Sequence, residues 1–294
     1  MSAPEVAFVL PAGGSTGAVQ VGILRALAER EILPDVVVGC SVGALNATFF
    51  ALDPGMEQAR MLARVWEMLS RRDIFGTGRA RTLARIIRRR DHIYDPRALR
   101  SLIRSLVPLD DLADAKIPVH IVTTDLDLGL ARWWTKGPAH ELLYASACLP
   151  GLFPPQVIDG RRHVDGGVLE PVPVQRAVET DASVIYVLGQ SSGPGEDVPA
   201  QMAALHVLLR SFGISRYARL PDPTSLAHTG QRVVVVPGAS AAGIDITDFS
   251  ATRRLVSEST SRAHRFLDDM DRSRASSSSE VSKPSIGRWR LVSP

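Results

Sequence analysis

A serine flanked by glycines is the strongest chemical signal in this chain. The motif Gly39-Cys40-Ser41-Val42-Gly43 fits the pattern G-x-S-x-G, and it lies between a predicted buried strand at Val36–Val38 and a predicted helix at Ala44–Leu52. In a nucleophile elbow the glycines allow a sharp turn, and the serine lies at the N-terminus of a helix whose dipole favours developing negative charge. We therefore expect Ser41 to be a nucleophile and the two glycines to form the elbow. From the residues alone, a strand–helix turn without chemistry is the alternative.

A second glycine motif, earlier in the chain, also fits G-x-S-x-G. Gly13-Gly14-Ser15-Thr16-Gly17 follows a predicted strand at Val6–Leu10 and precedes another predicted helix. Its small residues suit a loop whose backbone N–H groups point at an anion, so it could supply oxyanion donors for a reaction at Ser41. The alternatives are that Ser15 is itself the nucleophile, or that the loop binds phosphate. A phosphate loop is disfavoured, because the Lys-Ser/Thr of a P-loop and the glycine spacing of a dinucleotide fingerprint are missing.

An aspartate before two glycines is the candidate partner of the serine. Asp165-Gly166-Gly167 ends a predicted strand, and its glycines leave room for a close backbone approach and an outward-pointing carboxylate. A turn aspartate without chemistry is the alternative. The residue order of α/β-hydrolases would place a histidine after the acid. His206, His228 and His264 follow Asp165, but none of them lies in a distinctive loop.

The elements that must position these residues alternate between strand and helix. Short β-branched runs and helical patterns follow one another at a spacing that predicts right-handed βαβ units and a parallel sheet. The expected strands are Val6–Leu10, Val36–Val38, Val119–Thr124, Ala131–Thr135, Val157–Ile158, His163–Val164, Ser183–Leu188 and Arg232–Val236. Ile158-Asp159-Gly160-Arg161 predicts a type I′ hairpin turn, because Asp-Gly suits two positive φ angles.

The composition limits the class of protein. The chain has 294 residues, of which 45% are hydrophobic, and a formal net charge of +3. A charge so near neutral argues against a nucleic-acid binder, and the length suffices for one large α/β domain. Cys40 and Cys148 form neither a disulfide framework nor a metal-ligand spacing, so no metal is expected. The N-terminus has no basic region before its apolar run, which predicts a cytoplasmic protein without a secretory signal.

Four motifs in this order resemble those of the patatin-like phospholipase family, in its bacterial branch. They are Ala12-Gly13-Gly14-Ser15-Thr16-Gly17, Gly39-Cys40-Ser41-Val42-Gly43, Ser146-Ala147-Cys148-Leu149-Pro150-Gly151-Leu152-Phe153-Pro154-Pro155 and Val164-Asp165-Gly166-Gly167-Val168. The first resembles the family's glycine-rich oxyanion loop, the second its nucleophile elbow and the last the segment of its catalytic aspartate. The resemblance extends over Val6–Val174. It implies a three-layer α/β/α fold with a mostly parallel central sheet.

The resemblance also implies a Ser–Asp dyad that works without a histidine. Ser41 would be the nucleophile and Asp165 its base, with Gly166 and Gly167 in the dyad loop. The backbone N–H groups implied for the oxyanion hole belong to Gly13, Gly14, Ser15 and Gly17. No cofactor and no metal are implied.

Three functions are consistent with these residues and this resemblance. The leading one is a serine acyl hydrolase that cleaves esters of phospholipids or lysophospholipids through an acyl-enzyme. The second is a carboxylesterase or transacylase acting on soluble esters. The third is a catalytically weakened module that binds lipid or regulates a partner. Two departures keep the third open: Ala12 stands where the family has its first loop glycine, and Thr16 stands where the family has its usual arginine.

The near-neutral charge conceals an arginine-rich segment. Residues 71–104 hold 11 Arg against 3 Asp. The apolar residues that form stripes beside these arginines, as an interfacial helix requires, are Leu83, Ile86, Ile87, Leu99, Leu102 and Ile103. We expect this helical insertion to dock on anionic lipid at the membrane periphery through Arg85, Arg88 and Arg89. A solvated helical face is the alternative.

The expected domain organisation is simple. Residues 1–272 form one acyl hydrolase domain, which includes the insertion at 71–104. The Ser-rich residues 273–294 are expected to be a disordered tail.

Overall fold

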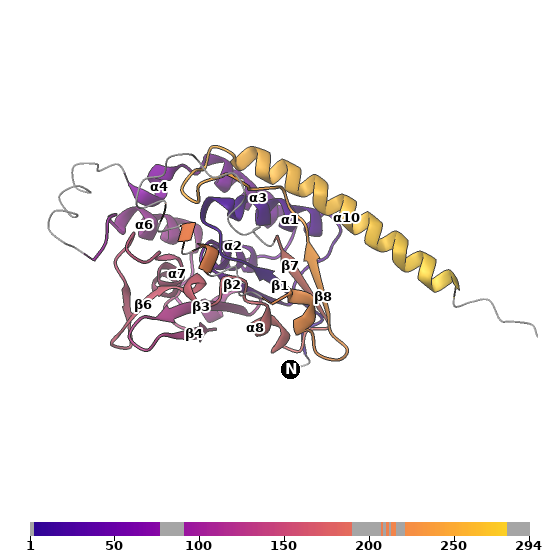
Figure 1. The fold of residues 1–294 in the computed structure, drawn as a ribbon, viewed down its shortest axis with the longest axis horizontal. Helices are drawn as coiled ribbons and strands as arrows, with labels where there is room; N and C mark the ends of the chain where they lie inside the picture. The colour runs from indigo at the N-terminus through magenta and orange to yellow at the C-terminus, as the bar shows by residue number, and fades with distance from the viewer. Residues whose placement is uncertain are drawn as a thin grey trace, which may run out of the picture.

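A central sheet of eight strands organises the computed structural model, which describes residues 3–76, 91–189, 207, 210–211, 213–215 and 221–280. Neighbours in the series β5-β6-β3-β2-β1-β7-β8 are hydrogen-bonded to each other, and β4 also pairs with β3 (Figure 1). They are β1 (Val6–Leu10), β2 (Val36–Cys40), β3 (Val119–Asp125), β4 (Leu130–Trp134), β5 (Gln156–Ile158), β6 (Arg161–Asp165), β7 (Val184–Leu188) and β8 (Arg232–Val236). β1, β2, β3, β7 and β8 are parallel to one another, whereas β4 and β6 run antiparallel to β3. The expectation of a mostly parallel sheet is confirmed.

Each strand expected from the sequence is present, with bounds that differ by at most two residues. The central strands are nearly continuous runs of valine, isoleucine and leucine, as strands buried on both faces require. The expected hairpin turn is also confirmed, because Asp159 and Gly160 have φ angles of 51° and 76° between the paired strands β5 and β6. Local sequence therefore determines this part of the fold.

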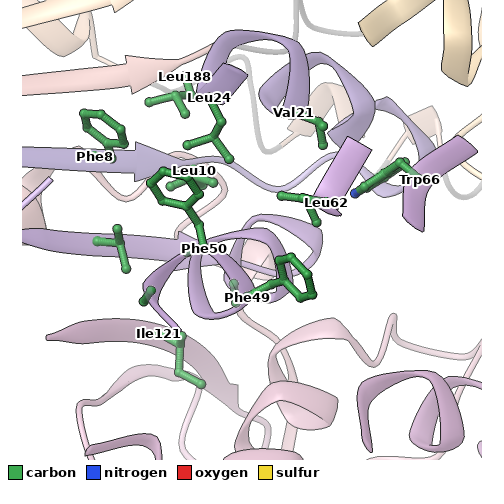
Figure 2. Packing of buried hydrophobic residues seen from close by; sticks show 14 of the residues in the cluster. Phe8, Leu10, Val21, Leu24, Phe49, Phe50, Leu62, Trp66, Ile121 and Leu188 are labelled. Atoms are coloured by element: carbon green, nitrogen blue, oxygen red, sulfur yellow. The ribbon is translucent and has the colours of Figure 1, made fainter. Parts of the chain in front are cut away.

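Helices cover both faces of the sheet, which gives three layers. The helices are α1 (Ala18–Ala28), α2 (Val42–Ala51), α3 (Met56–Met68), α4 (Arg71–Phe75), α6 (Arg97–Leu106), α7 (Ala139–Ala147), α8 (Val174–Val178) and α10 (Thr252–Glu280). Along β1, Phe8 and Leu10 point into a core formed with α1, α2 and α3, and Figure 2 shows them beside Leu24. The alternate residues Ala7 and Val9 belong to a second core, which α8 covers on the opposite face.

Two of the three predicted stripe residues on α6 face the protein core. Leu99 and Ile103 are only 3% and 0% exposed and belong to the main core. Of the arginines on this helix, Arg100 stacks on the ring of Tyr144 at 3.8 Å and Arg97 pairs with Asp95. The prediction that the stripe faces lipid is therefore wrong for Leu99 and Ile103, because an amphipathic helix buries its apolar face equally well against a protein core; Leu102 is half-buried. Residues 77–90, which include Leu83, Ile86, Ile87, Arg85, Arg88 and Arg89, lie outside the described residues.

The last helix is longer than the sequence predicts. α10 continues to Glu280, so residues 273–280 are helical and not part of a disordered tail (Figure 1). Neither glycine nor proline interrupts the chain between Thr252 and Pro284, and serine, although a modest helix former, does not stop a helix already packed on the domain. Residues 281–294 lie outside the described residues. No helix in the described part is long and apolar enough to cross a bilayer.

Candidate active site

The pairing register of β3 brings two strand ends together. Cys40, the last residue of β2, pairs with Val122, and Asp165, the last residue of β6, pairs with Thr123. β4 pairs with the other edge of β3 along the same stretch. β2 and β6 therefore follow one another along a single edge of β3, and they approach each other from opposite directions. Ser41, the next residue after β2, is thereby placed beside Asp165.

The two predicted dyad residues are in direct contact. Ser41 Oγ donates a hydrogen bond of 2.5 Å to Asp165 Oδ2. Asp165 Oδ1 accepts a hydrogen bond of 2.7 Å from the N–H of Gly167, which holds the carboxylate in place. Ser41 is 6% exposed and Asp165 is fully buried. A buried carboxylate that already accepts the hydrogen bond of a serine hydroxyl is placed to take its proton during nucleophilic attack.

Ser41 has the strained backbone of an elbow residue. Its φ of 57° and ψ of −124° lie outside the regions that residues with a side chain usually adopt, and it immediately precedes α2. A Cβ atom on Gly39 would lie 2.6 Å from the Cα of Ala44, and one on Gly43 would lie 2.0 Å from the carbonyl oxygen of Leu10. Both predicted elbow glycines are thus required by close backbone contacts.

Gly43→Ala is expected to lower the free energy of unfolding by about 2–4 kcal/mol, because the new methyl group meets a backbone oxygen that cannot move away. Gly55→Ala is the control, since a Cβ there meets nothing closer than 4.0 Å, and we expect it to cost less than about 1 kcal/mol. Urea unfolding of the two variants measures the difference. Equal losses would show that the contact between α2 and β1 is not as tight as described.

Glycine is also required next to the aspartate. A Cβ atom on Gly166 would lie 2.3 Å from the carbonyl oxygen of Val122 on β3. The turn η3 (Gly166–Val168) therefore packs directly on the strand that aligns the dyad. This contact, together with the hydrogen bond from Gly167, explains the glycine pair that follows Asp165.

Of the four predicted oxyanion residues, Gly14 shares a cavity with Ser41. Gly14 has a φ of +57° and begins η1 (Gly14–Gly17), a 3-10 turn whose first N–H groups have no acceptor within the turn. Ser15 is different. Its N–H donates to the carbonyl oxygen of Ile246 at 2.8 Å, and its hydroxyl donates to that of Asp245 at 2.9 Å. Ser15 is therefore not an oxyanion donor in this conformation, because its amide is already used.

Gly13 and Gly17 have structural contacts that sequence patterns do not show. The carbonyl oxygen of Gly13 accepts hydrogen bonds from the hydroxyl and the N–H of Thr16, at 2.8 and 3.2 Å. Thr16, which stands in place of the family's usual arginine, thus holds the loop locally. A Cβ atom on Gly17 would lie 2.7 Å from Val42 and 3.0 Å from Trp66, so this glycine allows the loop to pack on α2 and α3.

Ser41 lines an apolar cavity whose other walls come in part from α2, α3, α4 and α6. Six of the apolar side chains that line it are Leu62, Leu99, Leu102, Leu149, Phe153 and Phe249. Part of the arginine-rich segment therefore builds the wall of this cavity, which no sequence pattern predicted. An apolar group attached to a carbonyl at Ser41 would contact these side chains.

Two polar side chains that form hydrogen bonds around the site were not predicted from the sequence. Ser146 accepts a hydrogen bond of 3.0 Å from the N–H of Ser41. Asn46, on α2, donates to the carbonyl oxygen of Gly17 and to Gln20, and it accepts from the indole N–H of Trp66. The available signal for Asn46 was a polar residue within an otherwise apolar helix, since buried polar groups are almost always hydrogen-bonded.

In the described part of the chain, Ser41 Oγ is hydrogen-bonded to Asp165 and to no cysteine or histidine side chain. Cys40 and Cys148 are both buried, and burial raises the pKa of the Cys148 thiol to about 12, so the thiol stays protonated. His163, on β6, has its pKa lowered by burial and forms a hydrogen bond with Thr123. The side chain that accepts the hydrogen bond from Ser41 Oγ is the carboxylate of Asp165.

Comparison with known proteins identifies a family and several relatives. A family model described as patatin-like phospholipase matches residues 8–178, more than half of the chain. An uncharacterized NTE family protein of Mycobacterium bovis is 31% identical over 230 residues, which cover 75% of this chain and 61% of the relative. Patatin-like phospholipase domain-containing protein 7 of Rattus norvegicus is 30% identical over 195 residues, covering 66% and 14%. Lysophospholipase NTE1 of Mycosarcoma maydis is 26% identical over 196 residues, covering 64% and 10%. The chain spans less than two thirds of the length of each relative.

Proposed function

The chain belongs to the patatin-like phospholipase family, and we propose that it hydrolyses carboxylic ester bonds of phospholipids or lysophospholipids. One observation carries the proposal. The Ser41 hydroxyl lies 2.5 Å from the buried Asp165 carboxylate, and Ser41 lines an apolar cavity. The fungal relative is named a lysophospholipase, and we extend that substrate class to this chain as part of the proposal.

The proposed reaction has two halves. As Ser41 Oγ attacks the ester carbonyl carbon, its proton passes to Asp165, and backbone N–H groups at Gly13 and Gly14 stabilise the oxyanion. The tetrahedral intermediate collapses, the alcohol leaves with the proton from Asp165, and the acyl group stays on Ser41. Water then attacks the acyl-enzyme and gives a proton to Asp165. Release of the fatty acid returns this proton to Ser41.

The cavity supports a substrate with a long apolar chain. Its walls are formed largely by leucine and phenylalanine side chains, so burying a methylene there gains about 0.8 kcal/mol. A short soluble ester would leave most of that apolar surface uncovered. This is the physical argument for lipid esters over the soluble esters of a general carboxylesterase.

Mass spectrometry of lipid products tests the function directly. A mixed membrane extract is incubated with the wild-type protein and, in parallel, with Ser41→Ala. We expect free fatty acid and deacylated lipid to accumulate only with the wild type. Turnover restricted to short p-nitrophenyl esters would instead establish a soluble carboxylesterase. Retained vesicle binding without any turnover would establish a lipid-binding module.

The part of the arginine-rich segment that contains Arg85, Arg88 and Arg89 is the proposed contact with an anionic membrane surface. Changing Arg85, Arg88 and Arg89 to Glu is expected to weaken binding to anionic vesicles at low salt by on the order of 100-fold or more, since each basic residue near such a surface contributes about 1 kcal/mol. Vesicle co-sedimentation at two salt concentrations measures the effect, which high salt should reduce.

A matched charge reversal on another surface serves as the control. Arg253, Arg262 and Arg265 are exposed on α10, and changing them to Glu gives the same change in net charge. We expect this triple variant to bind vesicles more tightly than the first. Equal weakening would mean that total charge, not the position of the arginines, governs binding.

A further inference from the structure

The backbones of both dyad residues are bonded to one three-residue segment. The N–H of Ser41 donates to Ser146 Oγ, and the N–H of Asp165 donates to the carbonyl oxygen of Cys148, each at 3.0 Å. Ser146 lies in the last turn of α7, and Cys148 is the residue immediately after this helix. The strand ends that carry Ser41 and Asp165 therefore meet at the C-terminal end of α7.

The frame that holds this segment is buried and packed on several elements. α7 packs on β3, β6 and α2, and Ser146, Cys148 and Tyr144 are all fully buried. Tyr144 also donates a hydrogen bond of 2.9 Å to the carbonyl oxygen of Pro154, which anchors the chain beyond the helix. A side chain on such a frame holds its partner to a few tenths of an ångström, as a catalytic arrangement requires.

Ser41 needs such support, because its backbone is strained. A residue with a side chain at φ 57° and ψ −124° keeps that conformation only when its surroundings determine it. Ser41 is nearly buried, so little water is available to replace the oxygen of Ser146 as acceptor for its N–H. Without that acceptor, a turn of Ser41 toward an ordinary conformation would move its Oγ away from Asp165.

We propose that Ser146 is a positioning residue, whose hydroxyl holds the N–H of Ser41 and so directs Ser41 Oγ toward Asp165. The inference rests on the proposed function, since it takes Ser41 as the nucleophile. Ala147 and Leu149 line the cavity, whereas Ser146 is not among its lining residues. Loss of the Ser146 hydroxyl should therefore affect the chemical step and leave substrate binding unchanged.

Ser259 provides a matched control. Like Ser146, it is a fully buried serine on a helix whose hydroxyl accepts a backbone hydrogen bond, here from the N–H of Ala239 at 2.9 Å. It lies on α10 and contacts neither dyad residue. Replacing each serine with alanine removes the same chemical group, so the two variants separate a general loss of stability from a loss of position.

The kinetic test compares Ser146→Ala and Ser259→Ala on a p-nitrophenyl ester. For Ser146→Ala we expect kcat to fall at least tenfold with KM within twofold of the wild type, and fluorophosphonate labelling of Ser41 to slow in parallel. Ser146→Thr, which keeps the hydroxyl, should recover most of the lost kcat. For Ser259→Ala we expect a similar decrease in Tm with kcat within twofold of the wild type. A wild-type kcat in Ser146→Ala, or an equal loss in Ser259→Ala, would overturn the proposal.

Hydrogen exchange tests the same contact without any substrate. The amide of Ser41 should exchange at least tenfold faster in Ser146→Ala than in the wild type, while amides of the distant strand β8 keep their protection. If the wild type neither hydrolyses esters nor reacts with fluorophosphonate, the proposed function fails. Faster exchange at Ser41 would still support the role of Ser146 in holding the elbow. Unchanged exchange at Ser41 overturns that role whatever the activity.

Discussion

Ser41→Ala is expected to lower kcat for ester hydrolysis by on the order of 10⁴-fold or more and to abolish labelling by a fluorophosphonate probe. The reason is that, among the described residues that line the apolar cavity, Ser41 is the one with a hydroxyl, and this hydroxyl is bonded to a carboxylate. The change removes one oxygen from a site that the backbone already determines, so the fold should be retained. Single-turnover kinetics and intact-protein mass spectrometry of the labelled protein measure both effects.

Ser15→Ala is the informative comparison for this prediction, because Ser15 lies in the other G-x-S-x-G motif. Its hydroxyl contacts the carbonyl oxygen of Asp245 and not a carboxylate, so this variant should still be labelled, on Ser41. The rate of this labelling will depend on how far the loss of the Ser15 hydrogen bond loosens the glycine loop. Labelling of Ser41→Ala that disappears only when Ser15 is also removed would reverse the assignment of the two motifs.

The sequence predicted Ser41 and Asp165 as partners through the resemblance of their motifs to a family, and the glycines beside both residues have strong local requirements. An elbow needs small residues where the chain turns back on itself, and the contacts of Gly39 and Gly43 show that even one methyl group is too much. The same holds after Asp165, where Gly166 touches β3. Patterns of this kind are visible in a sequence because glycine is the one residue that satisfies them.

The parts that could not be predicted depend on contacts between distant segments. Ser15 was expected to donate its N–H to the oxyanion. Its N–H and its hydroxyl instead donate to the carbonyl oxygens of Ile246 and Asp245, about 230 positions further along the chain. Nothing in the loop itself indicates that partner. Similarly, the apolar stripe of α6 is the same pattern whether it faces lipid or the core, and its buried position is decided by packing around Ile103. Periodicity identifies the face that is buried but not what covers it.

Asp165→Asn is the second change with a large expected effect, a decrease in kcat of on the order of 10³- to 10⁴-fold. Asparagine has nearly the same shape, and its amide oxygen can still accept the hydrogen bond from Gly167. What it cannot do is take a proton from Ser41, either when Oγ attacks or when water enters the second half of the reaction. The variant therefore separates base catalysis from the packing of the strand end.

Asp125→Asn shows whether the effect belongs to the dyad. Asp125 is also fully buried and lies on the adjacent strand, but it caps the amides of Asp127 and Leu128 and pairs with Arg161 at 3.3 Å. Because these contacts are structural, Asp125→Asn should decrease Tm at least as much as Asp165→Asn does, while the folded fraction keeps a kcat within about threefold of the wild type, since a lost charged hydrogen bond costs stability alone. Circular dichroism gives the folded fraction, and ester hydrolysis gives kcat. If Asp165→Asn retained more than a tenth of the wild-type kcat, Asp165 would be a group that orients Ser41, and the proton would have to pass to another acceptor.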